Sequence, residues 1–183
     1  LLELCEKAQI PFGQTMLGLS AAPSDHPLNM GMLGMHGNLA PNVMTNQCDL
    51  LIAVGMRFDD RVTGNLDTYA KQAKVIHFDI DTSEIDKNVK TDLAVRGDCK
   101  SMLPRVSEYV LPSSHNSWIE GFKPYAEKEY NRVIGKAICP QEGPLLMGEI
   151  VRKVSEATND EAILVTDVGQ NQLFGCRYFR FKK

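Results

Sequence analysis

The residues of this chain best suited to chemistry follow the apolar run 49–54. Two arginines, Arg57 and Arg61, enclose two aspartates, Asp59 and Asp60. Guanidinium groups donate forked hydrogen bonds that suit phosphate, and carboxylates accept hydrogen bonds from sugar hydroxyls. The segment therefore has the chemistry of a nucleotide site. A solvated, salt-bridged turn is the alternative, because charged loops after strands are common.

Further polar groups stand where other apolar runs end. Asp79 and Asp81 close one run and Asp98 closes another, while segment 31–37 carries three glycines that let a backbone approach a ligand closely. In open α/β sheets the carboxyl ends of strands form the binding crevice, so these groups are predicted to converge there. Taken singly, strand-end aspartates are often helix caps, and His36 can be a helix-start or buried hydrogen-bonding residue.

Several familiar kinds of site have no counterpart in the sequence. Neither GxGxxG nor GxxxxGK[ST] occurs, and there is no Ser/His/Asp pattern, reactive-cysteine context or obvious general base. The 5 cysteines form no CxxC pair and the 4 histidines are scattered, which argues against a disulfide framework and a zinc site. The prediction is ligand binding with no catalytic residue in this chain.

The elements that must position these groups alternate between strand and helix. Strands alternating with helices predict βαβ units, and hence an α/β fold with a Rossmann-like, doubly wound parallel sheet. The predicted strands are 10–15, 49–54, 74–81 and 94–98, and the predicted helices are 1–8, 37–45, 66–72 and 100–110.

The pattern changes after residue 110. A polar helix over 116–135 has only a weak apolar stripe and is predicted to be a linker on a surface. The stretch 140–144 interrupts the chain, and 145–157 repeats the i, i+3, i+4 apolar spacing of a helix. A final strand over 162–166 completes what we expect to be the start of a second α/β domain.

Composition limits the classes of partner and compartment. The chain has 183 residues, 43% hydrophobic and 23% charged, with a net charge of −3. That charge predicts no affinity for nucleic acid or acidic membranes, and no apolar run approaches the roughly 18–20 residues of a membrane span. Unpaired cysteines and the lack of a signal peptide favour the cytoplasm. The opening at Leu1, without Met and in mid-helix, suggests a piece of a longer protein.

Four motifs carry a family resemblance over nearly the whole chain. They are MLGMHG at 32–37, GMRFDDRVTG at 55–64, HFDID at 77–81 and TDVGQ at 166–170. In order and spacing they resemble the catalytic subunits of acetolactate synthase (acetohydroxyacid synthase), a thiamine-diphosphate-dependent family. TDVGQ is similar to the start of that family's thiamine-diphosphate domain.

The resemblance implies an activity and a domain division. Members condense two pyruvates, or pyruvate and 2-ketobutyrate, with loss of CO2 in branched-chain amino-acid biosynthesis. Residues 1–110 would be the central FAD-binding domain without its amino-terminal part, 111–140 a linker, and 141–183 the beginning of the carboxyl-terminal domain. The implied cofactors are FAD, structural in role, with thiamine diphosphate and Mg²⁺ in the full-length enzyme. The implied assembly is a homodimer or tetramer, with or without a small regulatory subunit.

The resemblance also implies site residues. Asp60 and Arg61 would lie at the mouth of the substrate channel, where herbicides also bind in the family. Gln170 and Asn171 would contact thiamine diphosphate, although His is expected in place of Asn171 in most members. The implied FAD contacts are Thr15, Met16, Leu33, Gly34, Met35, His36, Gly55, Met56, Arg57, Phe58, Asp59, Asp79, Ile80, Asp98 and Cys99.

Two parts of the family's machinery are expected to lie outside this chain. One is the glutamate that drives ylide formation, from the amino-terminal domain, and the other is the metal-binding GDG…N segment, expected beyond Lys183. The isolated chain is therefore expected to be inactive. Two alternatives stay open: a non-catalytic nucleotide-binding or assembly module, and a flavin-free relative among thiamine-diphosphate enzymes.

Overall fold

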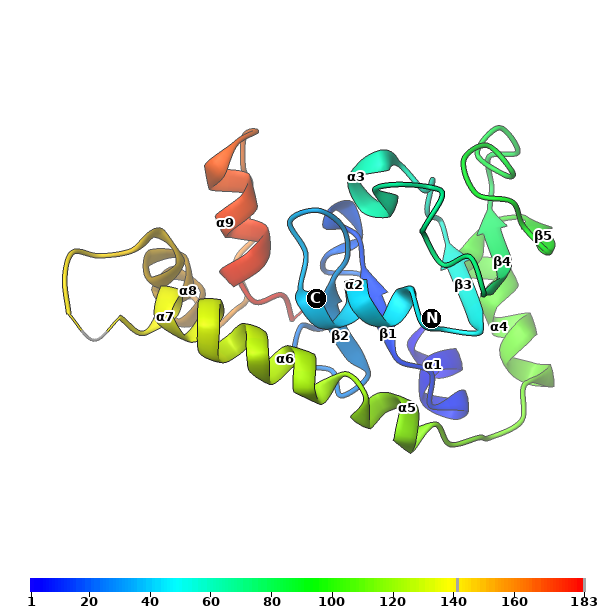
Figure 1. Ribbon diagram of the computed structural model, residues 1–183, viewed down its shortest axis with the longest axis horizontal. Coiled ribbons are helices and arrows are strands. Elements are labelled where there is room, and N and C mark those ends of the chain that lie inside the picture. Colours follow the sequence, from blue (N-terminus) through cyan, green and yellow to red (C-terminus); the bar gives the residue numbers. More distant parts are fainter. Residues whose placement is uncertain (141, 183) are drawn as a thin grey trace.

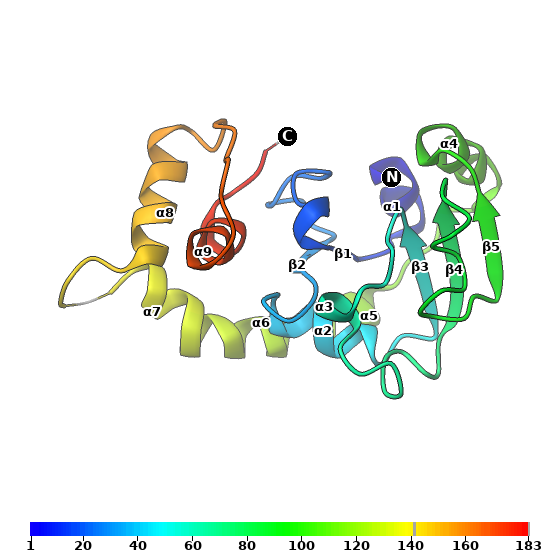
Figure 2. The same ribbon diagram turned by 90° about the horizontal axis from the view of Figure 1, so that it is seen from above.

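The computed structural model describes residues 1–140 and 142–182, and its strands form two parallel sheets. Strands β1 (Phe12–Gln14) and β2 (Asn29–Met32) form the smaller sheet. Strands β3 (Leu50–Val54), β4 (Lys74–Asp79) and β5 (Leu93–Arg96) form the larger one. Seen from above, they follow one another across the molecule as β2, β1, β3, β4 and β5 (Figure 2). The predicted α/β fold with parallel strands is confirmed.

Strands β3 and β4 of the larger sheet are packed on both faces. On one face, Phe78 packs with Leu4 of helix α1 (Leu2–Ala8) and Leu103 of helix α4 (Cys99–Tyr109). On the other face, Ala53 and Val75 pack with residues of the loops that follow β3. Successive residues along β3 and along β4 thus point into hydrophobic clusters on opposite faces of the sheet, as expected of parallel strands with both sides covered.

The helix predicted over 66–72 is wrong, because this segment is a series of turns. Asn65 closes the first turn by accepting from the amide of Asp67 at 2.9 Å. Ala70 has a left-handed backbone, with φ of 44°, and its amide donates to the side chain of Asn46 at 2.8 Å. These bonds take backbone groups that a helix would use internally. Instead a short helix, α3 (Asp60–Thr63), lies earlier in the chain.

Two short elements before α3 also differ from the prediction. A 3₁₀ helix, η1 (Met16–Gly18), follows β1, and neither this turn nor strand β2 was predicted. Helix α2 (Leu39–Thr45) agrees with the predicted helix over 37–45.

The predicted polar helix over 116–135 forms in four pieces along the outside of the molecule (Figure 1). They are α5 (Asn116–Glu120), α6 (Lys123–Glu129), the π-helical turn η2 (Tyr130–Ile134) and α7 (Gly135–Ile138). Pro124 has no amide hydrogen to donate, which accounts for a break just before α6. Phe122 at this break is buried against Ala40 and Met44 of α2, so this helical segment is anchored on α2.

The carboxyl-terminal part contains helices α8 (Met147–Ala157) and α9 (Gln170–Tyr178). Helix α8 agrees with the prediction, whereas α9 was not predicted. The predicted strand over 162–166 is wrong: the segment pairs with no strand among the described residues. Ile163 and Val165 are 91% and 86% exposed. The predicted domain boundary at Gln141 and the last residue, Lys183, lie outside the described residues.

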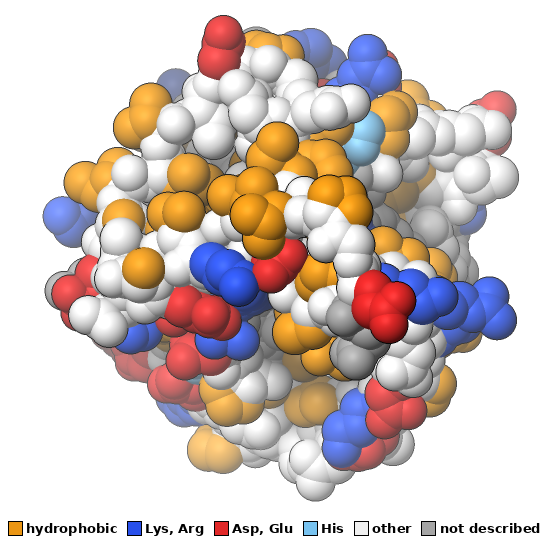
Figure 3. Space-filling model, turned by 90° about the vertical axis from the view of Figure 1, so that its left-hand side faces the viewer, with side chains coloured by type: hydrophobic (Ala, Val, Ile, Leu, Met, Phe, Trp, Pro, Cys, Tyr) orange, Lys and Arg blue, Asp and Glu red, His pale blue; other side chains and the backbone are white. Residues whose placement is uncertain are grey.

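This end of the molecule shows an apolar area among charged side chains (Figure 3). Exposed apolar residues on and just before α8 include Leu145, Leu146, Met147, Ile150 and Val154. No helix within residues 1–140 and 142–182 combines the length and apolar character that crossing a membrane requires.

Candidate functional site

A cavity of about 630 Å³ lies at the carboxyl ends of the strands. Its walls come from the segments that follow β1, β2 and β3, from Asp79 at the end of β4, and from the start of α9. The centre of this arrangement is the gap between β1 and β3, where the chain order along the strands reverses. Open α/β folds bind ligands at such switch points, and the volume suits a small-molecule site of roughly 300–1,000 Å³.

A buried ring fixes the loop between β3 and α3. Phe58 is 2% exposed, and its ring meets those of His77 and Tyr69 edge-on, with centroids 5.1 and 6.3 Å apart. Its backbone is left-handed, with φ of 53°, and its carbonyl accepts a hydrogen bond from Asn88 at 3.0 Å. An aromatic residue adopts this backbone only when its surroundings hold it there.

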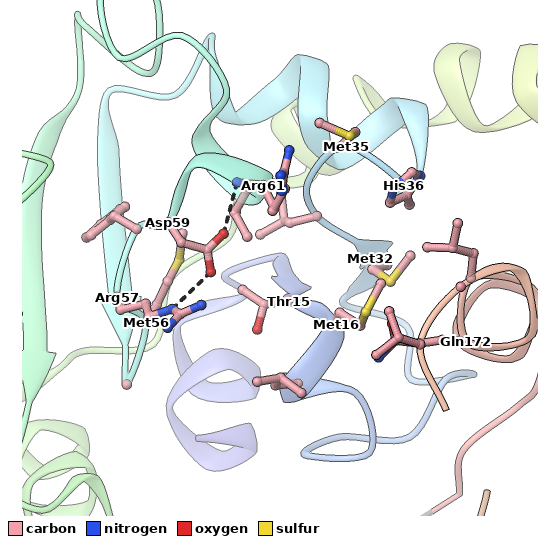
Figure 4. Close-up of a pocket in the computed structure, with 18 of the residues that line it drawn as sticks. Thr15, Met16, Met32, Met35, His36, Met56, Arg57, Asp59, Arg61 and Gln172 are labelled. Carbon is pink, nitrogen blue, oxygen red and sulfur yellow. Dashed lines mark hydrogen bonds and ion pairs between the residues drawn. The ribbon is translucent and has the colours of Figure 1, made fainter. Parts of the chain in front are cut away.

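Arg57 and Asp59, on either side of that ring, face the cavity (Figure 4). Arg57 donates through Nε to Asp59 Oδ2 at 3.0 Å. The other oxygen of Asp59 accepts from the amide of Arg61 at 2.9 Å and so caps α3. Within the described residues, the two terminal nitrogens of Arg57 make no hydrogen bond. An oriented guanidinium with free donors is suited to binding phosphate oxygens.

A tight turn forms the opposite wall. Gly34 has φ of +98°, and a Cβ there would lie 2.7 Å from the carbonyl oxygen of Arg61. Asn42 of α2 holds this glycine at both ends, accepting from its amide and donating to its carbonyl, each at 2.9 Å. The amide of Met35 donates to the carbonyl of Arg61 at 2.7 Å. The two loops that line the cavity are therefore joined backbone to backbone.

The ion pair of Arg57 and Asp59 lies on one side of the cavity, and a methionine-rich wall lies on the other. In Figure 4, Arg57 and Asp59 lie beside Met56 and across from Met16, Met32 and Gln172. Methionine is polarizable and adapts to flat rings, so this side suits an aromatic ligand group. The remaining apolar lining residues are Leu17, Leu33, Met35, Phe58, Val62, Val168 and Leu173.

The structure brings most of the predicted ligand residues together. Those that line the cavity are Thr15, Met16, Leu33, Met35, His36, Gly55, Met56, Arg57, Phe58, Asp59, Arg61 and Asp79. Gly34 and Asp60 line a second cavity of about 390 Å³, which shares Arg61 with the first. The Arg61 side chain makes no ion pair or hydrogen bond within the described residues, so its charge remains available between the two cavities.

Five predicted residues lie outside the lining of both cavities: Ile80, Asp98, Cys99, Gln170 and Asn171. Ile80 is 69% exposed, and Asp98 caps α4 by accepting from the amide of Lys100 at 2.8 Å. Asn171 accepts from the amide of Gln172 at 2.6 Å.

Seven lining residues were not predicted: Leu17, Met32, Val62, Val168, Gly169, Gln172 and Leu173. Met32 belongs to the segment 31–37 that was singled out for its glycines, so its position was within reach of the sequence pattern. No sequence signal marked Gln172 and Leu173, because α9 itself was not expected.

Three thiols shielded by burial do not favour nucleophilic chemistry. Burial raises the pKa of the Cys99 thiol, and the carboxylates of Asp79 and Asp98 raise it further. Burial likewise raises the pKa of Cys176, in α9, and the pKa of Cys5 to about 11. These thiols stay protonated at neutral pH, and the thiolate is the nucleophilic form. Among residues 1–140 and 142–182, no group of three or more His, Cys, Asp or Glu is placed to hold a metal ion.

A family model described as thiamine pyrophosphate enzyme, central domain, matches residues 1–106. This range covers β1 to β5 and most of α4, and so includes every strand that borders the cavity.

Curated relatives match nearly the whole chain. The acetolactate synthase large subunit of Parasynechococcus marenigrum (strain WH8102) is 41% identical over 181 residues, covering 97% of this chain and 28% of the relative. The probable acetolactate synthase large subunit of Methanocaldococcus jannaschii is 38% identical, covering 100% and 32%. The acetolactate synthase large subunit of Lactococcus lactis subsp. lactis (strain IL1403) is 39% identical, covering 97% and 30%. The chain thus spans about a third or less of the length of these relatives.

Proposed function

Because the chain belongs to the thiamine pyrophosphate enzyme family by its central domain, we propose that it is the central part of an acetolactate synthase large subunit. The names of its relatives and the RFDDRVTG segment at 57–64 support this proposal. We propose residues 1–110 as the central domain, 111–140 as a linker, and 141–183 as the beginning of a thiamine-diphosphate domain.

The ligand proposed for the cavity is FAD. The observation that carries this proposal is the pairing of a free, oriented guanidinium at Arg57 with a methionine-rich wall in one cavity at the switch point. Arg57 and the backbone around Gly34 would hold the diphosphate, since a side chain at Gly34 would collide with its neighbour. Asp79, 8% exposed at the end of β4, would accept from a ribose hydroxyl. Met16 and Met32 would pack on an aromatic ring system of FAD.

The whole protein's reaction is proposed as the condensation of two pyruvates, or pyruvate and 2-ketobutyrate, with loss of CO2. Thiamine diphosphate supplies the carbanion chemistry when it is bound. Arg61 would bind and orient the carboxylate of the 2-keto acid, since its charge is unpaired within the described residues and borders both cavities. Asp60 would lie beside it in the substrate channel.

Gln170 and Asn171, at the start of α9, are proposed to contact thiamine diphosphate. Asn171 already uses its side-chain oxygen for the amide of Gln172, which leaves its Nδ2 as the donor toward a ligand. We assign no proton-transfer step to this chain and expect the isolated chain to be inactive. The proposal includes Mg²⁺, a cytoplasmic location, and a homodimer or tetramer, with or without a small regulatory subunit, for the whole protein.

The experiment that tests the proposal compares FAD binding by Arg57→Ala and Arg105→Ala, with loss of flavin fluorescence as the readout. Arg105 lies exposed on α4 outside the cavity lining, so its replacement removes the same charge without touching the site. Losing a charge-assisted hydrogen bond costs about 1.5–3 kcal/mol, so Arg57→Ala should weaken binding roughly 10-fold or more. Equal affinities in the two variants would reject the assignment.

A further inference from the structure

An ion pair behind the cavity joins three segments that are far apart in the sequence. Arg177 of α9 pairs with Glu129 at the end of α6, and the two side chains are only 19% and 9% exposed. The same guanidinium donates to the carbonyl oxygens of His36 and Gly37, at 2.9 and 2.8 Å. One side chain therefore ties α9 and α6 to the turn that forms a cavity wall.

Glu129 extends the connection to the start of α2. Its Oε2 accepts from the amide of Leu39 at 2.9 Å and from the side chain of Asn38 at 3.3 Å. Asn38, the N-cap residue, makes no capping hydrogen bond because its own oxygen accepts from the amide of Met32 at 2.9 Å. The carboxylate of Glu129, from a distant part of the chain, thus caps the amino terminus of α2.

The network acts on both walls of the cavity. Helix α9 supplies Gln172 and Leu173 to the lining, and the turn held by Arg177 supplies Met35 and His36. The guanidinium of Arg177, which belongs to α9, contacts this turn directly. The short distances and low exposure make it a strong link, because hydrogen bonds to charged groups are worth more in a protein interior than in water.

We propose that Arg177 is a positioning residue that fixes the distance between α9 and the 32–37 turn and thereby the width of the ligand cavity. The effect on FAD rests on the proposed function, whereas the effect on the turn does not. Arginine suits this task because its planar fork serves two carbonyls and a carboxylate together. Lysine, with one nitrogen, can serve only some of these partners.

The test uses the 183-residue chain and two readouts. In Arg177→Met, the amide hydrogens of Leu39 and Met35 should exchange with solvent roughly tenfold faster or more, while that of Ile52 in β3 keeps its rate. FAD affinity should fall by a similar factor and be partly restored in Arg177→Lys. Arg180→Met is the matched control, because Arg180 follows α9, lies outside the cavity lining, and contributes its backbone amide to a bond with Ser155.

Each result decides the inference. Unchanged exchange at Leu39 and Met35 in Arg177→Met would overturn it. So would an equal acceleration of exchange at Ile52 in β3. If Arg177→Met does not fold, Arg177→Lys and Glu129→Gln still test it, since each breaks only part of the network and each should speed exchange at Leu39. If the unaltered chain fails to bind FAD, the assignment of FAD to this cavity fails, but the exchange rates decide the role of Arg177 on their own.

Discussion

Two backbone positions control where the charged groups of this site point. At Phe58 the left-handed backbone places the ring in the core, and the residues on either side face the cavity. At Gly34 the left-handed backbone lets one loop rest against the carbonyl of Arg61. The positions of the charged groups in the cavity therefore depend on two uncharged residues, Phe58 and Gly34.

Replacing Gly34 with alanine should damage both the fold and the site. The new Cβ would lie 2.7 Å from the backbone oxygen of Arg61, and the alanine would have to adopt an unfavourable φ of +98°. The matched control is Gly143→Ala, because Gly143 has φ of +105° but, among the described residues, no atom lies within 4 Å of a Cβ added there. Backbone strain costs about 1–3 kcal/mol at either position, so the collision should appear as the difference between the variants. Chemical denaturation would measure both stabilities; equal losses would refute the close contact.

At the residue scale the sequence was most informative about charge. The cluster from Arg57 to Arg61 was recognised from residue types alone, and Arg57, Asp59 and Arg61 do line one cavity. The role of Phe58 as a buried anchor was not foreseen. Its left-handed backbone arises from packing against His77 and Tyr69, and a pattern of residue types carries no record of that packing.

Among the elements, those with strong apolar patterns were predicted well. Strand β3 appeared as a continuous apolar run, and β4 as a run interrupted by His77, because both faces of these strands are packed. The error at 162–166 has the opposite cause: the residues favour a strand, but no described strand lies beside them to accept hydrogen bonds. Helix α9 was missed because its glycine and aromatic residues obscure a helical apolar stripe.

The extended segment 162–166 nevertheless keeps two different faces. A Cβ on Gly175 of α9 would lie 3.0 Å from Leu164 and 3.2 Å from Thr166, so these two side chains pack on α9. Ile163 and Val165 alternate with them and are almost fully exposed.

Substitutions on the two faces should therefore differ in cost. Leu164→Ala should lower the free energy of unfolding by about 1–2 kcal/mol because contacts with α9 are lost, whereas Val165→Ala should change it by less than about 0.5 kcal/mol. Thermal unfolding of the two variants provides the comparison. A larger loss for Val165→Ala would mean that the exposed face is packed in solution.

For the molecule as a whole, the cavity is built from segments as far apart in the chain as Thr15 and Leu173. Residues 1–106 supply one part of it, and α9 closes it from the other end of the chain. Local patterns predicted the first part, since each strand marks its own end. The second part depends on how helices α5, α6 and α7 place α9, a long-range arrangement held by Arg177, Glu129 and the packing of Phe122 on α2.

The central claim is that this cavity binds FAD, and the most direct test is a crystal structure of the chain grown with FAD. We predict a flavin nucleotide in the cavity, with phosphate oxygens at the free nitrogens of Arg57 and the ring system against Met16 and Met32. Crystals grown at an FAD concentration that saturates the protein in solution, yet with the nucleotide bound elsewhere or the cavity empty, would contradict the claim.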